Sequence, residues 1–257
     1  MADRQAERNK WLKQVLAENY HIAPLAGDAS FRRYFRVTAD DCDYVLMDAP
    51  PPHEDVSPFL AVLDWFDRAG IRVSKLFAED RDQGFLLLED FGDLTWAVFY
   101  QQGGELKSLF EDAIAQLHLL QGSEPGVELP PFDMARMRRE CDLYLDWYLP
   151  KVAGVQPTQQ QCEHFHHALR PALQKLAALS QVPVHLDYHS RNLMLPAGGL
   201  PLGVIDYQDA VNGPVTYDLA SLLYDCYQDY PEEQRRAWSR YFFESLPSSL
   251  ADTFESF

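Results

Sequence analysis

The sequence of 257 residues predicts an α+β protein in which a strand-rich first third is followed by a mostly helical remainder. Two observations lead to this fold class. Residues 22–89 contain short apolar runs separated by turn residues, a pattern typical of strands. From residue 104 onward, apolar residues recur at helical spacing. The chain length fits one large domain or two closely packed lobes.

The first third begins with a helix and continues mainly in strands. Residues 3–19 place Trp11, Leu12 and Val15 on one face of a helix, and such a face usually packs on a core. Short apolar segments bounded by turns follow. The expected strands cover residues 22–26, 34–37, 44–47, 73–78 and 85–89, with a helix at 58–68.

The remainder of the chain is expected to be helical, with one strand pair inserted. The expected helices cover residues 106–117, 134–149, 157–180, 219–227 and 231–246. Two short strands, 193–195 and 202–205, are joined by a turn rich in Pro and Gly. Polar clusters stand at the ends of these neighbouring strands, so their side chains can converge on one point.

The polar stretch before the strand pair carries the chemistry. It reads His185-Leu-Asp187-Tyr-His189-Ser-Arg-Asn192, and Asp206 follows at the end of the second short strand. Phosphoryl transfer needs a carboxylate that accepts the proton of the attacking hydroxyl, and oxygen ligands for Mg²⁺. The spacing D-x-x-x-x-N is typical of such a catalytic loop. It predicts Asp187 as the base and Asn192 and Asp206 as Mg²⁺ ligands.

Two other interpretations of this stretch stay open. Asp187 and Asn192 could serve only to turn a loop. His185, Asp187 and His189 are spaced two residues apart, which would put them on one side of a strand. They could bind zinc there, as in a zinc hydrolase. Against zinc, no other cluster of His or Cys in the sequence supplies a further ligand convincingly.

Further motifs resemble a known family. Asp187-x-x-x-x-Asn192, Ile-Asp206-Tyr-Gln-Asp-Ala and Gly213-Pro-x-x-Tyr-Asp218-Leu-Ala are similar to motifs of aminoglycoside phosphotransferase-like kinases. Within that superfamily the sequence resembles most the bacterial anomeric kinases of N-acetylmuramate and N-acetylglucosamine. The features that point there are the segments 27–36, 47–52, 86–92 and 187–194. The resemblance covers about residues 20–245.

This resemblance implies a protein-kinase-like fold with two lobes. A small N-lobe with a mixed β-sheet would cover residues 1–88, and a catalytic, mostly helical C-lobe would cover residues 89–257. Family members continue for several more helices after the point where this chain ends. We therefore expect the C-lobe to be incomplete at its C-terminus.

The resemblance also implies an ATP-dependent sugar kinase, with ATP as co-substrate and Mg²⁺ as cofactor. The expected acceptor is the anomeric hydroxyl of an amino sugar. Gly27, Asp28 and Ser30 would form a turn over the phosphates, although an ordinary hairpin turn explains them as well. Glu89 and Phe91 would lie at the hinge that binds adenine. Asp90-Phe91-Gly92 spells the kinase metal motif, but it precedes the catalytic loop by about a hundred residues, so we interpret it as a coincidence.

Other residues receive supporting roles. His185 would hold the catalytic loop, and Asp218 would accept hydrogen bonds from its backbone; a plain helix N-cap is the alternative for Asp218. Trp147 and Tyr148 could stack on the sugar ring, although an aromatic stripe on a helix is more often core. His189 is a further candidate for contact with the sugar.

One departure from the kinase pattern concerns the phosphates. The third strand, 44–48, lacks the usual Lys, and the helix at 58–68 lacks the Glu that pairs with it. Both halves are missing together, so no buried charge is left unpaired. Another cation should compensate, and Arg32, Arg33 and Arg36 are the candidates. Our hypothesis is Arg33, against the alternative of a solvated hairpin face.

Composition limits the partners. The net charge of −17, from 39 acidic and 22 basic residues, disfavours nucleic acid and anionic membranes. The four Cys show no metal or disulfide spacing, and no signal core or membrane span is visible, so we expect a cytoplasmic protein. Two rival functions stay open: a kinase of another small hydroxyl compound such as an aminoglycoside, and a nucleotide-binding module without transfer activity.

Overall fold

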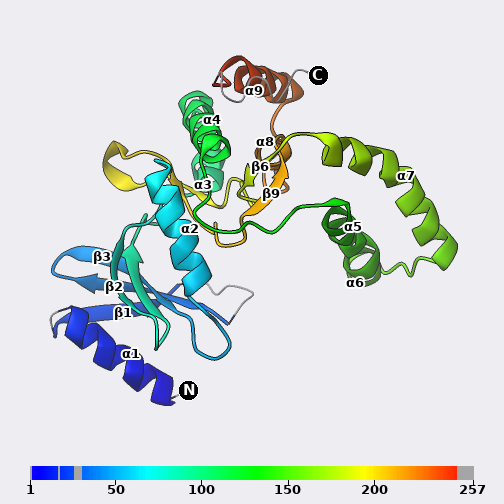
Figure 1. Cartoon of the computed structure of the whole chain (residues 1–257). Helices are drawn as coiled ribbons and strands as arrows, with labels where there is room; N and C mark the ends of the chain where they lie inside the picture. The colour runs from blue at the N-terminus through cyan, green and yellow to red at the C-terminus, as the bar shows by residue number, and fades with distance from the viewer. Residues whose placement is uncertain (1, 17, 26–30, 248–257) are drawn as a thin grey trace. The chain divides into compact units, whose positions relative to one another are not determined.

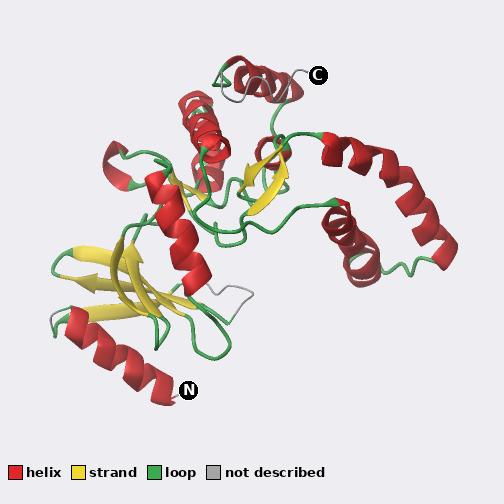
Figure 2. Cartoon of the chain, in the orientation of Figure 1, coloured by secondary structure: helices red, strands yellow, loops and turns green. Residues whose placement is uncertain are grey.

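The computed structural model describes residues 2–16, 18–25 and 31–247, and the chain forms two compact units. The first unit contains residues 1–105 and 191–208, and the second contains residues 106–190 and 209–257. Strands dominate the first unit and helices the second (Figure 2). The expected α+β class is confirmed. The first stretch of the first compact unit ends at residue 105. The lobe boundary expected at residue 88 stays a prediction.

The first unit is built on a five-stranded sheet with the order β1-β2-β3-β5-β4. Every neighbouring pair is antiparallel, so the expected mixed sheet is wrong in that detail. The strands are β1 (Tyr20–Pro24), β2 (Arg33–Ala39), β3 (Cys42–Asp48), β4 (Leu76–Asp80) and β5 (Phe85–Glu89). Alternation along these strands separates two faces, and each face has its own partners.

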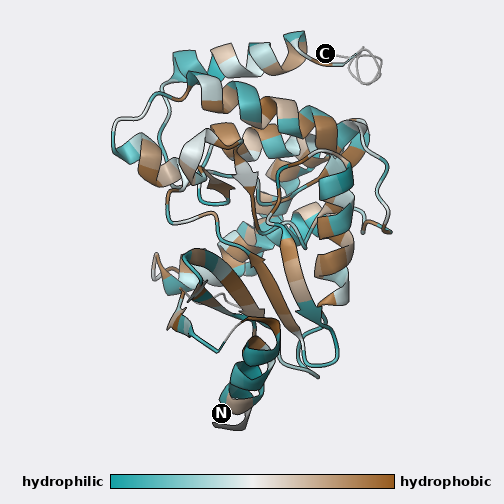
Figure 3. Cartoon of the chain, turned by 90° about the vertical axis from the view of Figure 1, so that its left-hand side faces the viewer, coloured by the Kyte–Doolittle hydropathy of each residue, from teal (hydrophilic) through white to brown (hydrophobic). Residues whose placement is uncertain are grey.

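One face of the sheet packs on helix α1 (Ala2–Val15), which lies along it in Figure 1. Trp11 and Leu12 pack there against a cluster that includes Val37, Leu46 and Leu87. Most of the helix is hydrophilic (Figure 3), in keeping with this narrow apolar contact. The helix ends at Val15, four residues before the end expected from the sequence.

The other face of the sheet lines a cavity together with α2 (Ser57–Arg68) and a returning hairpin. The hairpin consists of β7 (Leu193–Met194) and β8 (Gly203–Val204), joined through a short 3₁₀ turn at Ala197–Gly199. Backbone hydrogen bonds attach it to the segments that flank β4 and β5. Val204 N–H donates to the Arg72 carbonyl and Leu195 N–H to the Leu94 carbonyl, both at 2.8 Å. Helix α3 (Trp96–Gln101), capped by Thr95, also belongs to this unit.

The second unit is mainly helical around one strand pair. Its elements are α4 (Lys107–Gly122), α5 (Met134–Leu143), the π-helical turn η1 (Tyr144–Tyr148), α6 (Leu149–Lys151), α7 (Gln159–Ala178), α8 (Tyr217–Leu223) and α9 (Glu232–Glu244). Strand β6 (Gln181–Val184) pairs antiparallel with β9 (Val211–Pro214). Val184 and Val211 from this pair pack with Phe132 and Met137 in a buried cluster.

Three features of the helical unit differ from expectation. The single helix expected at 134–149 is divided by the π-helical turn, and the helix expected at 219–227 ends at Leu223. Strand β9 was not expected, because Val-Asn-Gly-Pro lacks an apolar run. In the described part of the chain, none of the helices has the length and apolar character needed to cross a membrane.

Candidate active site

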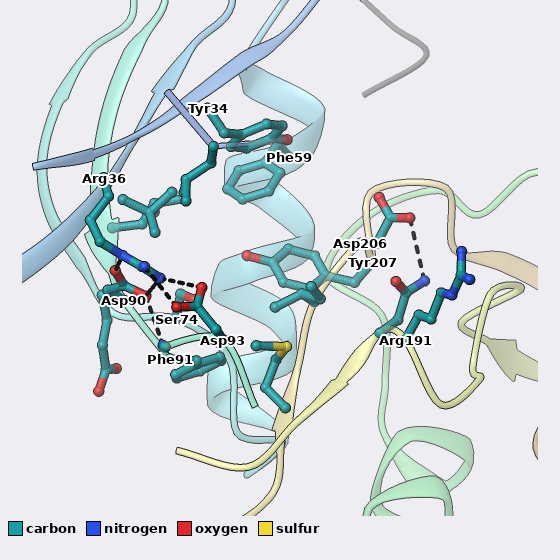
Figure 4. A pocket seen from close by; sticks show the side chains of 18 of the residues that line it. Tyr34, Arg36, Phe59, Ser74, Asp90, Phe91, Asp93, Arg191, Asp206 and Tyr207 are labelled. Atoms are coloured by element: carbon teal, nitrogen blue, oxygen red, sulfur yellow. Dashed lines mark hydrogen bonds and ion pairs between the residues drawn. The ribbon is translucent and has the colours of Figure 1, made fainter. Parts of the chain in front are cut away.

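A cavity of about 620 Å³ lies in the first unit. It is bounded by the face of the sheet opposite to α1, by α2 and by the β7–β8 hairpin. Leu25, Val45, Leu88, Met194 and Ile205 give it apolar walls. Polar groups enter from the segment after β5 and from the residues around β7 and β8, as Figure 4 shows. This size and this mixture of walls are typical of a small-molecule site. The apolar part can accept a flat ring, and the polar part can accept charged groups.

Asn192 and Asp206 come together at the polar end of this cavity. Asn192 immediately precedes β7, and Asp206 follows Ile205 just after β8. Ile205 N–H donates to the Asn192 carbonyl at 3.1 Å, which fixes the two segments side by side. The Asn192 amide nitrogen then lies 3.4 Å from Asp206 Oδ2, the contact drawn as a dashed line beside Arg191 in Figure 4.

Asp206 is held in a conformation that a non-glycine residue rarely adopts. Its φ is +66°, in the left-handed region. Gln208 Nε2 donates to its Oδ1 at 2.7 Å. Backbone strain of this kind persists where the surroundings enforce it, and it occurs often at functional sites. Here it directs the Asp206 carboxylate at Asn192.

These two side chains fit a hard cation such as Mg²⁺. Both carry oxygen atoms, the ligands that Mg²⁺ prefers, and it commonly uses one or two protein side chains together with phosphates and water. A half-turn of the Asn192 amide would present its oxygen instead of its nitrogen. Within residues 2–16, 18–25 and 31–247, no group of three or more His, Cys, Asp or Glu could hold a metal ion. His185, Asp187 and His189 therefore do not form the zinc site that the sequence left open.

The segment 185–190, which carries Asp187, belongs to the second unit and is held by Asp218. The Asp218 carboxylate accepts hydrogen bonds from the backbone N–H groups of His185, at 2.7 Å, and Leu186, at 3.1 Å. Burial raises the pKa of Asp218 to about 7, although these two hydrogen bonds and the nearby Asp187 charge also act on it. Leu186 has a φ of +84°, so this turn is strained and needs such support.

His185 and Tyr188, which belong to the segment 185–190 themselves, also hold it in place. His185 is fully buried, and its Nδ1 accepts the Asp187 backbone N–H at 3.2 Å, so this nitrogen carries no proton. The Tyr188 hydroxyl donates to the Ala113 carbonyl of α4 at 3.0 Å. Backbone and side chains on both sides of Asp187 are thus fixed within the second unit.

Comparison with known proteins identifies the family. The sequence profile of the phosphotransferase enzyme family matches residues 21–252. This chain belongs to that family. It is 36% identical over 97% of its length to the N-acetylmuramate/N-acetylglucosamine kinase of Pseudomonas aeruginosa and covers 77% of that protein. It is 38% identical over 90% of its length to the kinase of the same name from Neisseria meningitidis and covers 69% of it.

The fold has counterparts among solved structures. The ADP-bound aminoglycoside phosphotransferase APH(2'')-Ib aligns with a TM-score of 0.65 and 17% identity, over 96% of this chain and 84% of that one. The expected protein-kinase-like fold and the resemblance to aminoglycoside phosphotransferase-like kinases are confirmed. The protein is an ATP-dependent phosphotransferase with a hydroxyl group as acceptor.

In this phosphotransferase, both residues expected at the adenine hinge line the cavity. Glu89 is paired with Arg72 through two hydrogen bonds, of 2.6 and 2.8 Å, and these lower the pKa of its carboxyl group. Phe91 is buried with the Arg72 guanidinium 4.8 Å from its ring centre. Its ring would lie 2.5 Å from a Cβ placed on Gly203, so only glycine lets β8 pass this close.

The structure does not place Arg33 at this cavity, and its role as the compensating cation stays a prediction. Arg33 shares the alternation of Phe35 and Val37, which pack on the α1 side of the sheet, and it is not among the residues that line the cavity. Arg36 and Tyr34 have the opposite alternation and do line it. The period of two in β2 was visible in the sequence, and it puts Arg36 and Arg33 on opposite faces of the sheet.

Arg36 connects β2 to the segment after β5. Its guanidinium pairs with the carboxylates of Asp90 and Asp93, the latter at 2.9 and 3.0 Å (Figure 4). Asp90 also accepts the Gly92 N–H at 2.7 Å. Sequence reasoning missed this group, because the two aspartates lie 54 and 57 residues after the arginine.

Tyr207 is a second cavity residue that sequence reasoning missed. Its ring packs against Phe59, at 5.1 Å, and Phe66, at 5.3 Å, on α2. Burial raises the pKa of its hydroxyl well above the usual value. Among the described residues the hydroxyl has no hydrogen-bond partner. Aromatic packing thus connects helix α2 to Tyr207, the residue after Asp206.

The remaining predicted residues lie outside the described residues or in the second unit. Gly27, Asp28 and Ser30 lie outside the described residues. Trp147 and Tyr148, in the π-helical turn of the second unit, are 59% and 45% exposed, which excludes the core alternative. The His189 ring, also in the second unit, packs edge-on against Tyr227 at 5.2 Å. The roles of all these residues stay predictions.

Proposed function

We propose that this phosphotransferase transfers the γ-phosphoryl group of ATP to the anomeric hydroxyl of N-acetylmuramate or N-acetylglucosamine. The observation that carries the proposal is the 36% identity over 97% of the chain to a kinase of that name. A cytoplasmic place in cell-wall recycling goes with this proposal, since such sugars come from peptidoglycan.

The base in this mechanism is Asp187. Its carboxylate accepts the proton of the anomeric hydroxyl, whose oxygen forms a bond to the γ-phosphorus as the bond to the bridging oxygen of ADP breaks. An anomeric hydroxyl is more acidic than an ordinary alcohol, so a carboxylate of ordinary basicity suffices. The hydrogen bonds that fix the segment around Asp187 support this role, because a base must be held in place.

The nucleotide would occupy the cavity of the first unit. Its apolar walls suit adenine, and the paired Asn192 and Asp206 would hold Mg²⁺ at the polar end. When bound, Mg²⁺ neutralises charge on the phosphates. Asn192 and Asp206 contribute by presenting oxygen atoms from two segments that the backbone already fixes together. Trp147, Tyr148 and His189 are the proposed contacts of the sugar.

An assay of ADP release over a panel of acceptors tests the proposal. N-acetylmuramate and N-acetylglucosamine should support turnover, and the methyl glycoside of N-acetylglucosamine should not, because its anomeric oxygen carries no proton. Asp187→Asn should lower kcat by about 10²–10⁴-fold, the usual contribution of a general base. Turnover of the methyl glycoside at the rate of the free sugar would contradict the proposal.

The same panel should include an aminoglycoside. The net charge of −17 is the one feature that favours a cationic acceptor. A kcat/KM for the aminoglycoside above that for both amino sugars would move the acceptor class to such antibiotics. Binding of ATP without release of ADP on any acceptor would instead favour a nucleotide-binding module.

A further inference from the structure

A second buried carboxylate, Asp225, holds the other end of the segment that carries Asp187. It lies two residues after α8 ends and is 6% exposed. Its Oδ2 accepts the backbone N–H of Ser190 at 2.8 Å, and its Oδ1 accepts the N–H of Tyr227 at 2.7 Å. Both carboxylate oxygens are therefore used, one on each of two chain segments.

Asp225 and Asp218 act on opposite ends of the same short loop. Asp218 binds the N–H groups of His185 and Leu186, and Asp225 binds that of Ser190. The two carboxylates belong to one stretch of chain, at the beginning of α8 and just past its end. All these contacts lie within the second unit.

The neighbours of Asp225 strengthen the second anchor. Tyr227, whose N–H it accepts, packs its ring against the edge of His189 at 5.2 Å. Ser190 is fully buried, so the loop end cannot exchange its hydrogen bond for one with water without opening the unit. A loop that contains one strained residue, Leu186 at a φ of +84°, would relax if either end were released.

We propose that Asp225 is a positioning residue that acts on phosphoryl transfer through Asp187. This inference rests on the proposed function, since it assigns Asp225 to the same reaction. Asp218 fixes the chain before Asp187, and Asp225 fixes it three residues after. Release of the Ser190 end lets the loop relax and moves the Asp187 carboxylate from its productive place. A displacement of about 1 Å costs on the order of 10²-fold in rate.

Asp225→Asn tests this position with little change in shape. An amide offers one acceptor oxygen, and its NH₂ group cannot accept the second N–H. The variant should lower kcat by about 10–100-fold and leave KM for ATP and for the sugar within about threefold. Asp229→Asn on the same segment is the matched control, because the Asp229 side chain is 99% exposed. It should keep wild-type kcat.

A double-mutant cycle with Asp187 separates positioning from a general loss of structure. In the Asp187→Asn background, Asp225→Asn should reduce the residual rate by less than about threefold, because the base through which it acts is already absent. Effects that multiply in full would overturn the inference. Wild-type kcat in Asp225→Asn beside an inactive Asp187→Asn would also overturn it, while leaving the proposed function intact.

Hydrogen exchange gives a readout independent of the sugar. The peptide covering residues 185–192 should exchange faster in Asp225→Asn than in the wild type, and Asp229→Asn should not differ from the wild type. Should the amide variant fail to fold, Asp225→Glu keeps a carboxylate but shifts it by one methylene, and it should show the same split of kcat from KM. Full activity of Asp187→Asn would remove the base itself, and the inference would fall with the proposed function. Unchanged exchange in a folded Asp225 variant refutes the anchor even if no acceptor turns over.

Discussion

Single polar side chains of this phosphotransferase are buried at a cost in free energy, which their hydrogen bonds offset. Asp218 is the clearest case, because a fully buried carboxylate has given up water in exchange for two backbone N–H groups. That exchange holds the loop but leaves the pKa of Asp218 at about 7, against 3.8 for a free side chain. Its contribution to stability should therefore depend on pH.

The sign of that dependence follows from proton binding. Between about pH 4 and pH 7 the folded protein keeps a proton on Asp218 that the unfolded chain has released. The free energy of unfolding therefore falls as pH rises through this window, by at most about 1.4 kcal/mol per pH unit from this group. Asp218→Asn should remove this slope. In urea unfolding at pH 5, 6 and 7.5, the free energy of unfolding of the variant, relative to that of the wild type, should therefore increase with pH. Asp229→Asn should run parallel to the wild type. A difference for Asp218→Asn that does not change with pH would contradict the pKa.

Tyr207 gives a second test at this scale. Its hydroxyl is buried and has no partner among the described residues, and such a group costs about 1–3 kcal/mol. Tyr207→Phe keeps the ring contacts with Phe59 and Phe66 and should raise the free energy of unfolding of the nucleotide-free protein. Urea unfolding measures it. A loss of more than about 1 kcal/mol would mean that the hydroxyl has a partner.

Elements of the first unit are joined by charge as well as by apolar packing. Arg36 on β2 pairs with Asp90 and Asp93, and the Asp90 side chain is only 4% exposed. Removing one partner of a buried pair leaves the other charge without compensation, which typically costs about 3–5 kcal/mol. The pair Arg68–Asp64 on α2 is exposed by 59% and 67% and should be worth under about 1 kcal/mol.

These two arginines form a matched pair of variants. Arg36→Met should lower the free energy of unfolding by about 3–5 kcal/mol, and Arg68→Met by less than about 1 kcal/mol. Adding Asp90→Asn to Arg36→Met should recover part of the loss, because the unpaired charge is then gone. Chemical denaturation of the four proteins decides the matter. Equal effects of the two arginine variants would show that burial does not set the strength of the pair.

Sequence patterns predicted elements where one local signal dominated. Strand β5 was predicted at its observed bounds, because Phe-Leu-Leu-Leu lies between clear turn residues. Helix α2 was predicted within one residue, with Pro58 near its start. The π-helical turn at 144–148 was not predictable, because its residues read as an ordinary continuation of the helix before it. Strand β9 depends on its pairing with β6, which no local pattern reveals.

In the candidate site, too, local spacing predicted some residues, and contacts between distant segments concealed others. Asn192 and Asp206 were predicted from their spacing and lie together in the first unit. For the cation on β2, the motif drew attention to arginines without regard to their alternation, and the choice of Arg33 stays a prediction. Asp225 was missed, because its partner Ser190 lies 35 residues earlier and no motif links them. Contacts between distant segments are what a single sequence conceals.

For the whole molecule, nucleotide binding should be measurable as stabilisation. A ligand at 100 times its Kd adds about 2.7 kcal/mol to the folded state. ATP should raise Tm, and Mg²⁺ should add to that rise in the wild type, because Asn192 and Asp206 are the proposed oxygen ligands of the metal. In Asp206→Ala the additional effect of Mg²⁺ should disappear while ATP alone still binds. A thermal-shift titration measures both, and an Mg²⁺ effect of the same size in Asp206→Ala would remove Asp206 from the metal site.

The most direct test of the central claim is the identity of the phosphorylated oxygen. After incubation with ATP, Mg²⁺ and N-acetylglucosamine, the product should show a ³¹P signal coupled to the anomeric proton of the sugar. The same signal should be absent with Asp187→Asn over the same time. A phosphate coupled to the protons of another carbon, or free phosphate with no sugar phosphate at all, would contradict the assignment of this chain as an anomeric sugar kinase.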